Sequence, residues 1–345
     1  MGLTYQTMEW RGDGLRLLDQ RALPTQLSYI DATSVDLLID AIITLAVRGA
    51  PALGAAGAFG VVIAMDQAGR EGWNEARLAF EIDRIRSSRP TAVNLAWGVD
   101  RVRPLIVQGR AAVLADAQVI TREDQEANHA MGKLGADWLL ERLGDRKLRL
   151  LTHCNTGTLA TTGWGTALGV IRELAIRERI ELVYVDETRP LLQGARLTAW
   201  ELTQDGIPHV VAPDGAAAST IMRGLVDAAL IGADRVAANG DAANKIGSVG
   251  VALACADAGI PFLVVAPEST VDLNTTDGDD IQIELRSDDE VLNFAGVRTA
   301  PLESKAFNPA FDVTPARLIT AFVCESVVLE VAKGETPGAH WGSGS

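Results

Sequence analysis

From about residue 148 onward, short apolar runs alternate with segments of helical pattern, and this alternation constrains the fold more than any other feature of the chain. The runs are nearly continuous in apolar residues, as is typical of strands buried on both faces. The segments between them are long enough for the crossover helices that parallel strands require. The pattern therefore predicts an α/β fold, a doubly wound parallel sheet whose strands lie at residues 148–154, 180–187, 209–213, 227–234 and 261–268.

Each of these runs ends in polar or small residues, among them Cys154, Asp186, Asp214, Asp234 and Glu268. In open parallel sheets, ligands bind beyond the carboxyl ends of the strands. We therefore expect these five strand ends to converge on one site.

The N-terminal part of the chain has a helical pattern. Ser34 is placed to cap one helix. Breaks at Pro51, Pro90 and Gly109 separate the rest. Further helices are predicted over residues 53–67, 74–86, 92–107 and 124–142.

Together these patterns divide the chain into two parts. We expect a mainly helical N-terminal domain over residues 1–125, followed by a Rossmann-like catalytic domain over residues 126–345. A helix over residues 126–143 is expected to connect them. A final helix is predicted over residues 316–332, and the acidic stretch 277–290 is expected to form a lid-like loop.

Charge and composition exclude several classes of partner. The 345 residues include 31 Lys and Arg against 45 Asp and Glu, a net charge of −14. Such a chain is a poor candidate for binding nucleic acid or an anionic membrane. The uncharged run at residues 49–65 is expected to be a packed turn and helix, being short for a membrane span.

The cysteines and the N-terminus indicate the compartment. Cys154, Cys255 and Cys324 form no CxxC pair and no zinc-type cluster. A sparse, odd number of cysteines fits a reducing compartment. The first residues show no basic-then-apolar signal pattern. We therefore expect a cytoplasmic protein without a metal site.

The stretch THCNTGTLATTG at residues 152–163 is the strongest chemical signal. Its backbone N–H groups are placed to hold a phosphate, and the local dipole favours a thiolate at Cys154. A free cysteine is more often a small buried hydrophobe, and that is our interpretation of Cys255 and Cys324. For Cys154, the polar, Gly-rich surroundings favour a function. His153 points to the opposite face of its strand, so we assign it a structural role.

Other candidate ligand-binding residues are cations and amides in the loops that join the predicted helices and strands. Arg48 precedes a glycine-rich stretch, RGAPALGAAGAFG, whose spacing is not that of a dinucleotide-binding loop. Arg89 stands before a Pro turn, where a surface cation and a functional one are equally well supported. Gln193 precedes a helix and is placed to bond a ligand hydroxyl.

One connection carries three polar residues, Asp234, Asn244 and Lys245. A lone strand-end Asp is often only a helix cap. Here an acid, an amide and a cation occur together, and Lys245 suits a phosphate. Asn244 and Lys245 are expected to open a helix.

Taken together, these segments resemble the methylthioribose-1-phosphate isomerase family over nearly the whole chain. The segments that carry the resemblance are RGAPALGAAGAFG, SRPTAVNLAWG, THCNTGTLATTGWGTALGVI, VYVDETRPLLQGARLTAWEL, GADRVAANGDAANKIG and NPAFDVTP. Strings of the RGAP and DETRP type are shared with the related regulatory subunits of a eukaryotic translation-initiation exchange factor and with ribose-1,5-bisphosphate isomerases. The strings around Cys154 and Asp234 follow the isomerase pattern.

The resemblance implies an isomerase of the methionine salvage pathway that converts 5-methylthioribose 1-phosphate to 5-methylthioribulose 1-phosphate. It implies a helical domain joined to a Rossmann-like domain, a homodimer, and no cofactor or metal. It also implies that Cys154 and Asp234 are the catalytic pair. The substrate-binding residues that it implies are Arg48, Gly49, Ala50, Arg89, Gln193, Asn244 and Lys245.

Two questions remain open at the level of the sequence. Hydrogen transfer from C2 to C1 can proceed as a proton carried by Cys154 through an enediol, or as a direct hydride shift. The substrate can also be a neighbouring sugar phosphate, such as ribose 1,5-bisphosphate or 5-deoxyribose 1-phosphate. A further alternative is a non-catalytic regulatory subunit of the same fold. Two features disfavour it: Cys154 and Asp234 are both present, and there is no long N-terminal extension.

Overall fold

The computed structural model describes residues 5–89 and 93–342. The chain begins with a small antiparallel sheet of β1 (Met8–Trp10), β2 (Leu15–Leu18) and β3 (Tyr29–Ala32). No strand was predicted in this part of the chain, which is otherwise helical as expected. These strands are three or four residues long, too short for an alternation that a pattern can register. Leu15 and Leu17 are fully buried against the helices that follow.

The N-terminal helices are α1 (Val35–Ile43), α2 (Ala50–Glu71), α3 (Glu75–Arg86), α4 (Val93–Val102) and α5 (Arg110–Leu143). The predicted cap at Ser34 is present, and Asn74 caps α3 in the same way. Ser34 accepts a hydrogen bond from the Leu37 N–H at 3.3 Å, and Asn74 accepts one from the Arg77 N–H at 2.9 Å.

The helix predicted over residues 92–107 is shorter than expected. Its start at Ala92, together with the break at Pro90, lies outside the described residues. The α-helix ends at Val102, and Arg103–Gln108 form a 3₁₀ segment. Pro104 has no N–H to continue the α-helical hydrogen bonds, which explains the break.

Helix α2 has the length and hydropathy of a membrane span, but most of it is buried inside the molecule. Ala50 and every residue from 52 to 64 are buried. A Cβ atom at Gly98 would collide with the carbonyl of Gly54, so α4 crosses α2 at a contact between two glycines. The expectation of a packed helix is confirmed, and its apolar character is explained by the core.

The large sheet has the strand order β16-β15-β10-β7-β4-β5-β6. All pairs from β6 to β15 are parallel, and β16 alone runs antiparallel to its neighbour. In chain order the six parallel strands lie 3-2-1-4-5-6, the order of the doubly wound fold. The predicted strands are confirmed as β4 (Leu148–Thr152), β5 (Ile180–Asp186), β6 (His209–Ala212), β7 (Ala228–Ile231) and β10 (Phe262–Val265).

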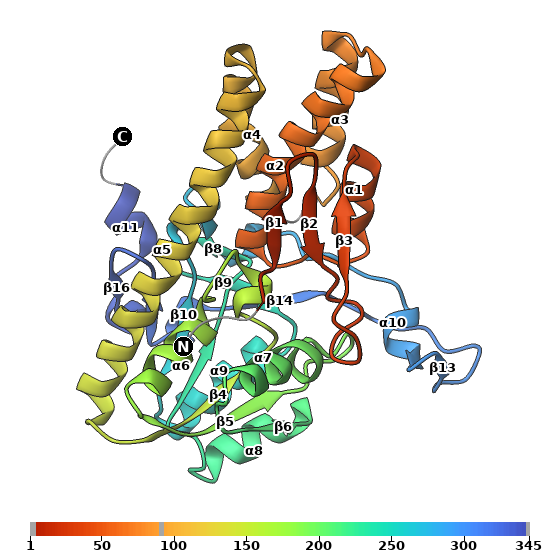
Figure 1. The fold of residues 1–345 in the computed structure, drawn as a ribbon. Helices are drawn as coiled ribbons and strands as arrows, with labels where there is room; N and C mark the ends of the chain where they lie inside the picture. Colours follow the sequence, from red (N-terminus) through yellow and green to blue (C-terminus); the bar gives the residue numbers. More distant parts are fainter. Residues whose placement is uncertain (1–4, 90–92, 343–345) are drawn as a thin grey trace.

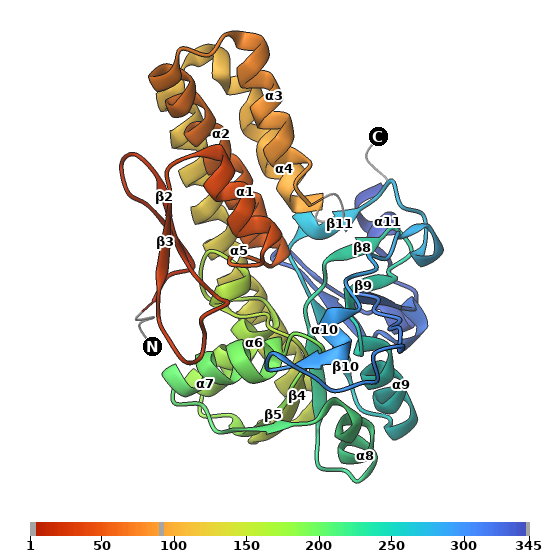
Figure 2. The same ribbon diagram turned by 90° about the vertical axis from the view of Figure 1, so that its right-hand side faces the viewer.

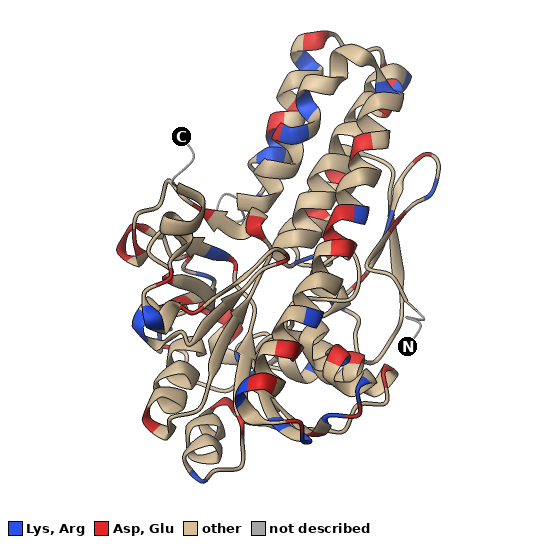
Figure 3. Ribbon diagram, turned by 90° about the vertical axis from the view of Figure 1, so that its left-hand side faces the viewer, with Lys and Arg blue, Asp and Glu red and all other residues tan. Residues whose placement is uncertain are grey.

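Helices cover both faces of this sheet (Figures 1 and 2). Leu150 and Leu230 pack under α5, α6 (Ala167–Ile176) and α7 (Ala199–Gln204). Leu151 and Ile231, one residue further along each strand, face α8 (Ala217–Met222) and α9 (Ser248–Ala258). Charged residues lie mainly on the helices and loops, and the central strands carry few of them (Figure 3).

The predicted final helix over residues 316–332 was wrong. This segment contains two strands, β15 (Ala321–Val323) and β16 (Val328–Leu329), flanked by short 3₁₀ turns at Ala316–Leu318 and Val331–Lys333. Phe322 and Val323 are buried in different cores on the two faces of the sheet. A short apolar run fits either a helix face or a buried strand, and periodicity cannot separate the two.

A second sheet, of order β11-β8-β9-β14, stands beside the large one. Its strands are β11 (Val271–Asp272), β8 (Arg235–Ala237), β9 (Ala242–Lys245) and β14 (Phe311–Thr314). Asn244 and Lys245 end β9 and pair with β14, so the prediction that they open a helix was wrong; α9 begins at Ser248. The C-terminal third also holds α10 (Asp289–Leu292), the hairpin β12 (Asn293–Phe294) and β13 (Val297–Arg298), and α11 (Pro337–Trp341).

Helix α5 belongs to both parts of the molecule and runs from the N-terminal helices along the sheet (Figure 1). It starts 14 residues earlier than the predicted 124, at residue 110. Val113, Ala117 and Ile120 lie in the N-terminal core, whereas Met131 and Leu139 lie in the core under the sheet. The division between residues 125 and 126 falls inside this helix and stays a prediction.

Candidate active site

A cavity lies at the carboxyl ends of β4 and β7, where the strand order of the sheet reverses, and has an empty volume of about 660 Å³ including its mouth. Open α/β sheets bind ligands at this place. The N-terminal helices close the cavity from the other side. All nine catalytic and substrate-binding residues that the family resemblance implied line it: Arg48, Gly49, Ala50, Arg89, Cys154, Gln193, Asp234, Asn244 and Lys245.

The N-terminal end of α2 forms one wall. Gly49 precedes the helix with a φ of 93°, and a Cβ atom there would collide with the backbone of Ala160. Only glycine fits both conditions. Ala50 then begins the helix at the cavity. Free N–H groups and the helix dipole favour an anion at such a position.

Two buried polar atoms in the cavity have no partner among the described residues. Arg48 is 9% exposed, and its Nε is unpaired although one Nη donates to Asn155 Oδ1. Gln193 is 3% exposed, and its Oε1 is unpaired. Each such group costs about 1–3 kcal/mol when buried without a partner. A ligand that brings an acceptor to Arg48 and a donor to Gln193 removes both costs.

The backbone of Cys154 is fixed from two sides. Its N–H donates to Thr188 Oγ1 at 2.9 Å, and its carbonyl accepts from Thr198 Oγ1 at 2.6 Å. Its φ is 63°, a left-handed conformation that a non-glycine residue seldom adopts. Such conformations cluster at functional sites, because the surroundings must impose them. The side chain is 6% exposed and lines the cavity.

Asp234 carries a carboxyl in an enclosed place. Burial raises its pKa above the usual 3.8, and the nearby cations Lys245, Arg89 and Arg48 offset part of that rise. Its side chain accepts no hydrogen bond from the described part of the chain. A raised pKa keeps a larger share of the carboxyl protonated toward neutral pH. The group is therefore suited to donate a proton to a ligand.

Asn244 and Lys245 present their side chains from the end of β9. The Lys245 ammonium donates to the carbonyl of Ala310 at 2.9 Å and lies 4.5 Å from the centre of the Phe311 ring. Burial lowers the pKa of Lys245, and the neighbouring Cys154 and Asp234 counteract this. Asn244 Nδ2 donates to Ser248 Oγ at 2.9 Å.

Arg89 reaches the cavity from the connection between α3 and α4. It lies 3.7 Å from Glu284, and burial lowers its pKa. Arg48 and Arg89 both come from the N-terminal part, as expected, and meet Cys154 across the junction.

Some strand-end residues lie elsewhere, so the expectation that all five converge was wrong in part. Asp186 is buried and bonded to His153 Nδ1 at 3.0 Å, while His153 Nε2 contacts the carbonyl of Ile246 at 2.8 Å. His153 thus has the structural position expected of it. Asp214 accepts the N–H groups of Thr188 and Arg189, and Glu268 accepts the hydroxyl of Ser326. None of these three acids lines the cavity.

Other residues also line the cavity without having been predicted to bind the substrate, among them Arg286 and Asn155. Arg286 lies in the acidic stretch and pairs with Glu290 at 2.6 Å. Arg286 is the one cation in the acidic stretch 277–290, and this was the sequence feature that could have indicated a site residue. Cys255 and Cys324 are fully buried away from the cavity, and burial raises the pKa of Cys255 to about 12, which confirms them as small core residues.

Comparisons with known proteins place the chain among its relatives. A model of the initiation factor 2 subunit family matches residues 46–330. The chain is 49% identical to the methylthioribose-1-phosphate isomerase of Alkalilimnicola ehrlichii over 332 residues, 94% of each chain. It is 53% identical to a probable bifunctional methylthioribose-1-phosphate isomerase/methylthioribulose-1-phosphate dehydratase of Nocardia farcinica, but it spans only 61% of that relative's length.

Two solved structures are similar over nearly their whole length. One is 5-methylthioribose 1-phosphate isomerase from Pyrococcus horikoshii, with a TM-score of 0.84, 37% identity and coverage of 94% of this chain and 92% of that one. The other is the delta subunit of translation initiation factor eIF-2B from A. fulgidus, with a TM-score of 0.83, 38% identity and coverage of 97% and 99%. The two scores are nearly equal, so the fold alone does not separate the two names. The resemblance drawn from the sequence motifs is confirmed: the chain belongs to the initiation factor 2 subunit family and, within it, to the group of the methylthioribose-1-phosphate isomerases.

Proposed function

We propose that this chain is an aldose–ketose isomerase that converts 5-methylthioribose 1-phosphate to 5-methylthioribulose 1-phosphate. The observation that carries the proposal is that Cys154 and Asp234 share one cavity with the unpaired buried atoms of Arg48 and Gln193. The relatives' names support the choice of substrate. We further propose that the protein acts in the cytoplasm as a homodimer and without a cofactor.

The phosphate is assigned to the cationic end of the cavity. Arg48, Arg89 and Lys245 supply charge, and the start of α2 at Gly49 and Ala50 supplies the helix dipole. Gln193 and Asn244 are assigned to the sugar hydroxyls. A sugar phosphate bound in the cavity displaces water from these groups and strengthens each polar contact.

Ring opening is assigned to Asp234. The anomeric phosphate keeps the substrate in its furanose form, so the ring oxygen must be protonated before the bond to C1 can break. Burial raises the pKa of Asp234, which is the direction that favours a proton donor. The proton passes to the ring oxygen, and the electron pair of the C1–O bond leaves with that oxygen.

For the next step we favour proton transfer by Cys154. The thiolate takes the proton from C2, and the electron pair of that C–H bond forms the C1–C2 double bond of an enediol phosphate. The thiol then returns a proton at C1 while the 2-hydroxyl gives its proton to the Asp234 carboxylate, which leaves a ketone at C2 and restores both residues. Turnover in deuterated water then places some deuterium at C1 of the product, visible by NMR. Zero incorporation together with residual activity in Cys154→Ala would favour the direct hydride shift.

The substrate is tested with a panel of three sugar phosphates: 5-methylthioribose 1-phosphate, ribose 1,5-bisphosphate and 5-deoxyribose 1-phosphate. Ketose formation is measured for each at equal concentration. We expect kcat/KM to be highest for the methylthio compound. A preference for the bisphosphate would replace the proposed substrate, and Arg286 gives that alternative a further cation in the cavity. No turnover of any of them would favour a regulatory subunit.

A further inference from the structure

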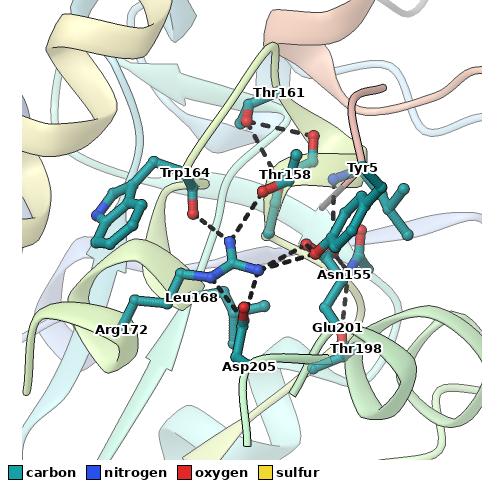
Figure 4. A network of polar contacts seen from close by, with 12 residues as sticks. Tyr5, Asn155, Thr158, Thr161, Trp164, Leu168, Arg172, Thr198, Glu201 and Asp205 are labelled. Atoms are coloured by element: carbon teal, nitrogen blue, oxygen red, sulfur yellow. Dashed lines mark hydrogen bonds and ion pairs between the residues drawn. The ribbon is translucent and has the colours of Figure 1, made fainter. Parts of the chain in front are cut away.

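A buried polar network is shown in Figure 4, and it reaches the cavity through Asn155. At its centre is the carboxylate of Glu201 in α7, which is fully buried. It accepts hydrogen bonds from Tyr5 at 2.8 Å, from Arg172 at 3.0 Å and from Asn155 Nδ2 at 2.7 Å. Arg172 is fully buried as well and also pairs with Asp205 at 2.7 Å.

This network fixes which way the Asn155 amide faces. A carboxylate only accepts hydrogen bonds, so the amide nitrogen must point to Glu201. The same nitrogen donates to Thr198 Oγ1 at 3.1 Å. The amide oxygen is thereby left facing the cavity, where it accepts from Arg48. Asn155 is 4% exposed, and its hydrogen bonds to Glu201, Thr198 and Arg48 hold the amide in this orientation.

The loop that carries Asn155 is itself shaped around Glu201. A Cβ atom at Gly157 would collide with the Glu201 carboxylate, so the backbone passes closer to it than any other residue type allows. Arg172 donates to Thr158 Oγ1 at 3.0 Å and to the carbonyl of Trp164. The network thus holds the part of the loop that follows Asn155.

We propose that Asn155, oriented by Glu201, is a positioning residue that holds the Arg48 guanidinium ready for the substrate's phosphate. This inference rests on the proposed role of Arg48. One Nη of Arg48 is taken by Asn155, and its Nε is buried without a partner among the described residues. An arginine held in this way already has the rotamer that presents its remaining donors. Less side-chain conformational entropy is therefore lost when the anion binds.

The test compares variants by their affinity for inorganic phosphate, measured by calorimetry, and by steady-state kinetics. Asn155→Leu keeps the size of the side chain but frees Arg48. We expect the dissociation constant for phosphate and KM both to rise about tenfold, the effect of one charge-assisted hydrogen bond, while kcat changes less than threefold. A kcat loss with unchanged phosphate affinity would overturn the proposal.

A double-mutant cycle shows whether Asn155 acts through Arg48. Arg48→Gln removes the anion contact, and adding Asn155→Leu should then weaken phosphate binding by less than twofold. Independent, additive effects of the two changes would contradict the proposal. Where Asn155→Leu does not fold, Asn155→Asp replaces it. That carboxylate neutralises Arg48 and repels Glu201, so phosphate affinity should again fall; unchanged affinity would count against the inference.

Asp205→Asn is the matched control. It weakens the ion pair with Arg172 but leaves the contacts of Asn155 in place. We expect lower thermal stability with unchanged phosphate affinity and unchanged KM. A KM rise equal to that of Asn155→Leu would assign the effect to general loosening and reject a specific role for Asn155. Because phosphate binding is measured without turnover, these results stand even if the proposed substrate is wrong.

Discussion

Two walls of the same cavity are built in opposite ways. On the wall that carries Cys154, every residue from 151 to 172 is buried. On the wall that carries Arg286, Leu292 is the one buried residue between positions 284 and 300. The first wall is held by the network around Arg172 and Glu201, and the second by local pairs such as Arg286 with Glu290. The contrast teaches that Cys154 is held in a buried loop, while the segment that carries Arg286 covers the cavity from a largely exposed position.

The largest effect on activity is expected for Cys154, on the buried wall of residues 151–172 (the fixed wall), and for Asp234, the acid proposed to act with it. Cys154→Ser keeps the size but raises the pKa of the group far above neutral, and Asp234→Asn removes the proton donor. Each should lower kcat by about 10²- to 10⁴-fold, the usual value of general acid–base catalysis, with phosphate affinity preserved. Near-normal turnover in either variant would remove that residue from the mechanism. Cys255→Ala is the control and should cost stability only.

Breaking the network beneath the fixed wall should mainly affect folding. Arg172→Leu leaves the Glu201 and Asp205 carboxylates buried without their cation. Removing one partner of a buried ion pair costs about 3–5 kcal/mol of unfolding free energy. Denaturant unfolding measures the change. A loss below 1 kcal/mol, about the value of an exposed pair, would mean that the wall is not fixed by this network.

The covering wall should respond differently. Arg286→Gln removes a cation from the cavity, and we expect KM to rise severalfold with kcat nearly unchanged. The unfolding free energy should change by about 1 kcal/mol or less, because Arg286 and Glu290 form a local pair on the less buried wall. Glu290→Gln removes the same ion pair and leaves the cation, so it separates the two effects. A stability loss as large as that of Arg172→Leu would erase the contrast between the walls.

The smallest effect concerns pH. Asp124 in α5 accepts the N–H and the hydroxyl of Thr162, each at 2.7 Å, at the far end of the fixed wall. Burial raises its pKa from 3.8 to about 6. Between these values the folded state holds a proton that the unfolded state has lost, so this group's contribution to stability falls as pH rises through that window. In Asp124→Asn that part of the pH dependence should disappear from unfolding curves. An unchanged pH profile would place the pKa of Asp124 near its ordinary value.

The strands of the large sheet could be predicted because burial on both faces makes each one a continuous apolar run. The same pattern predicted cavity residues at the ends of these strands, such as Cys154 and Asp234. The last two strands, β15 and β16, and the three short N-terminal strands could not, since each is too short to show a period. The role inferred for Asn155 depends on Glu201, which is 46 residues away along the chain. No local pattern reports a contact made by folding, although Asn155 stands next to Cys154.

Helix α5 has a consequence for how the protein unfolds. Its first half is part of the N-terminal core and its second half part of the core under the sheet. A helix of 34 residues is about 50 Å long, and its hydrogen bonds are continuous from one core to the other. Melting either core therefore removes the support of a helix that the other needs. We expect one cooperative unfolding transition in calorimetry. The arginines of the N-terminal part and the loop of Cys154 should then become ordered, or lose their order, in the same transition.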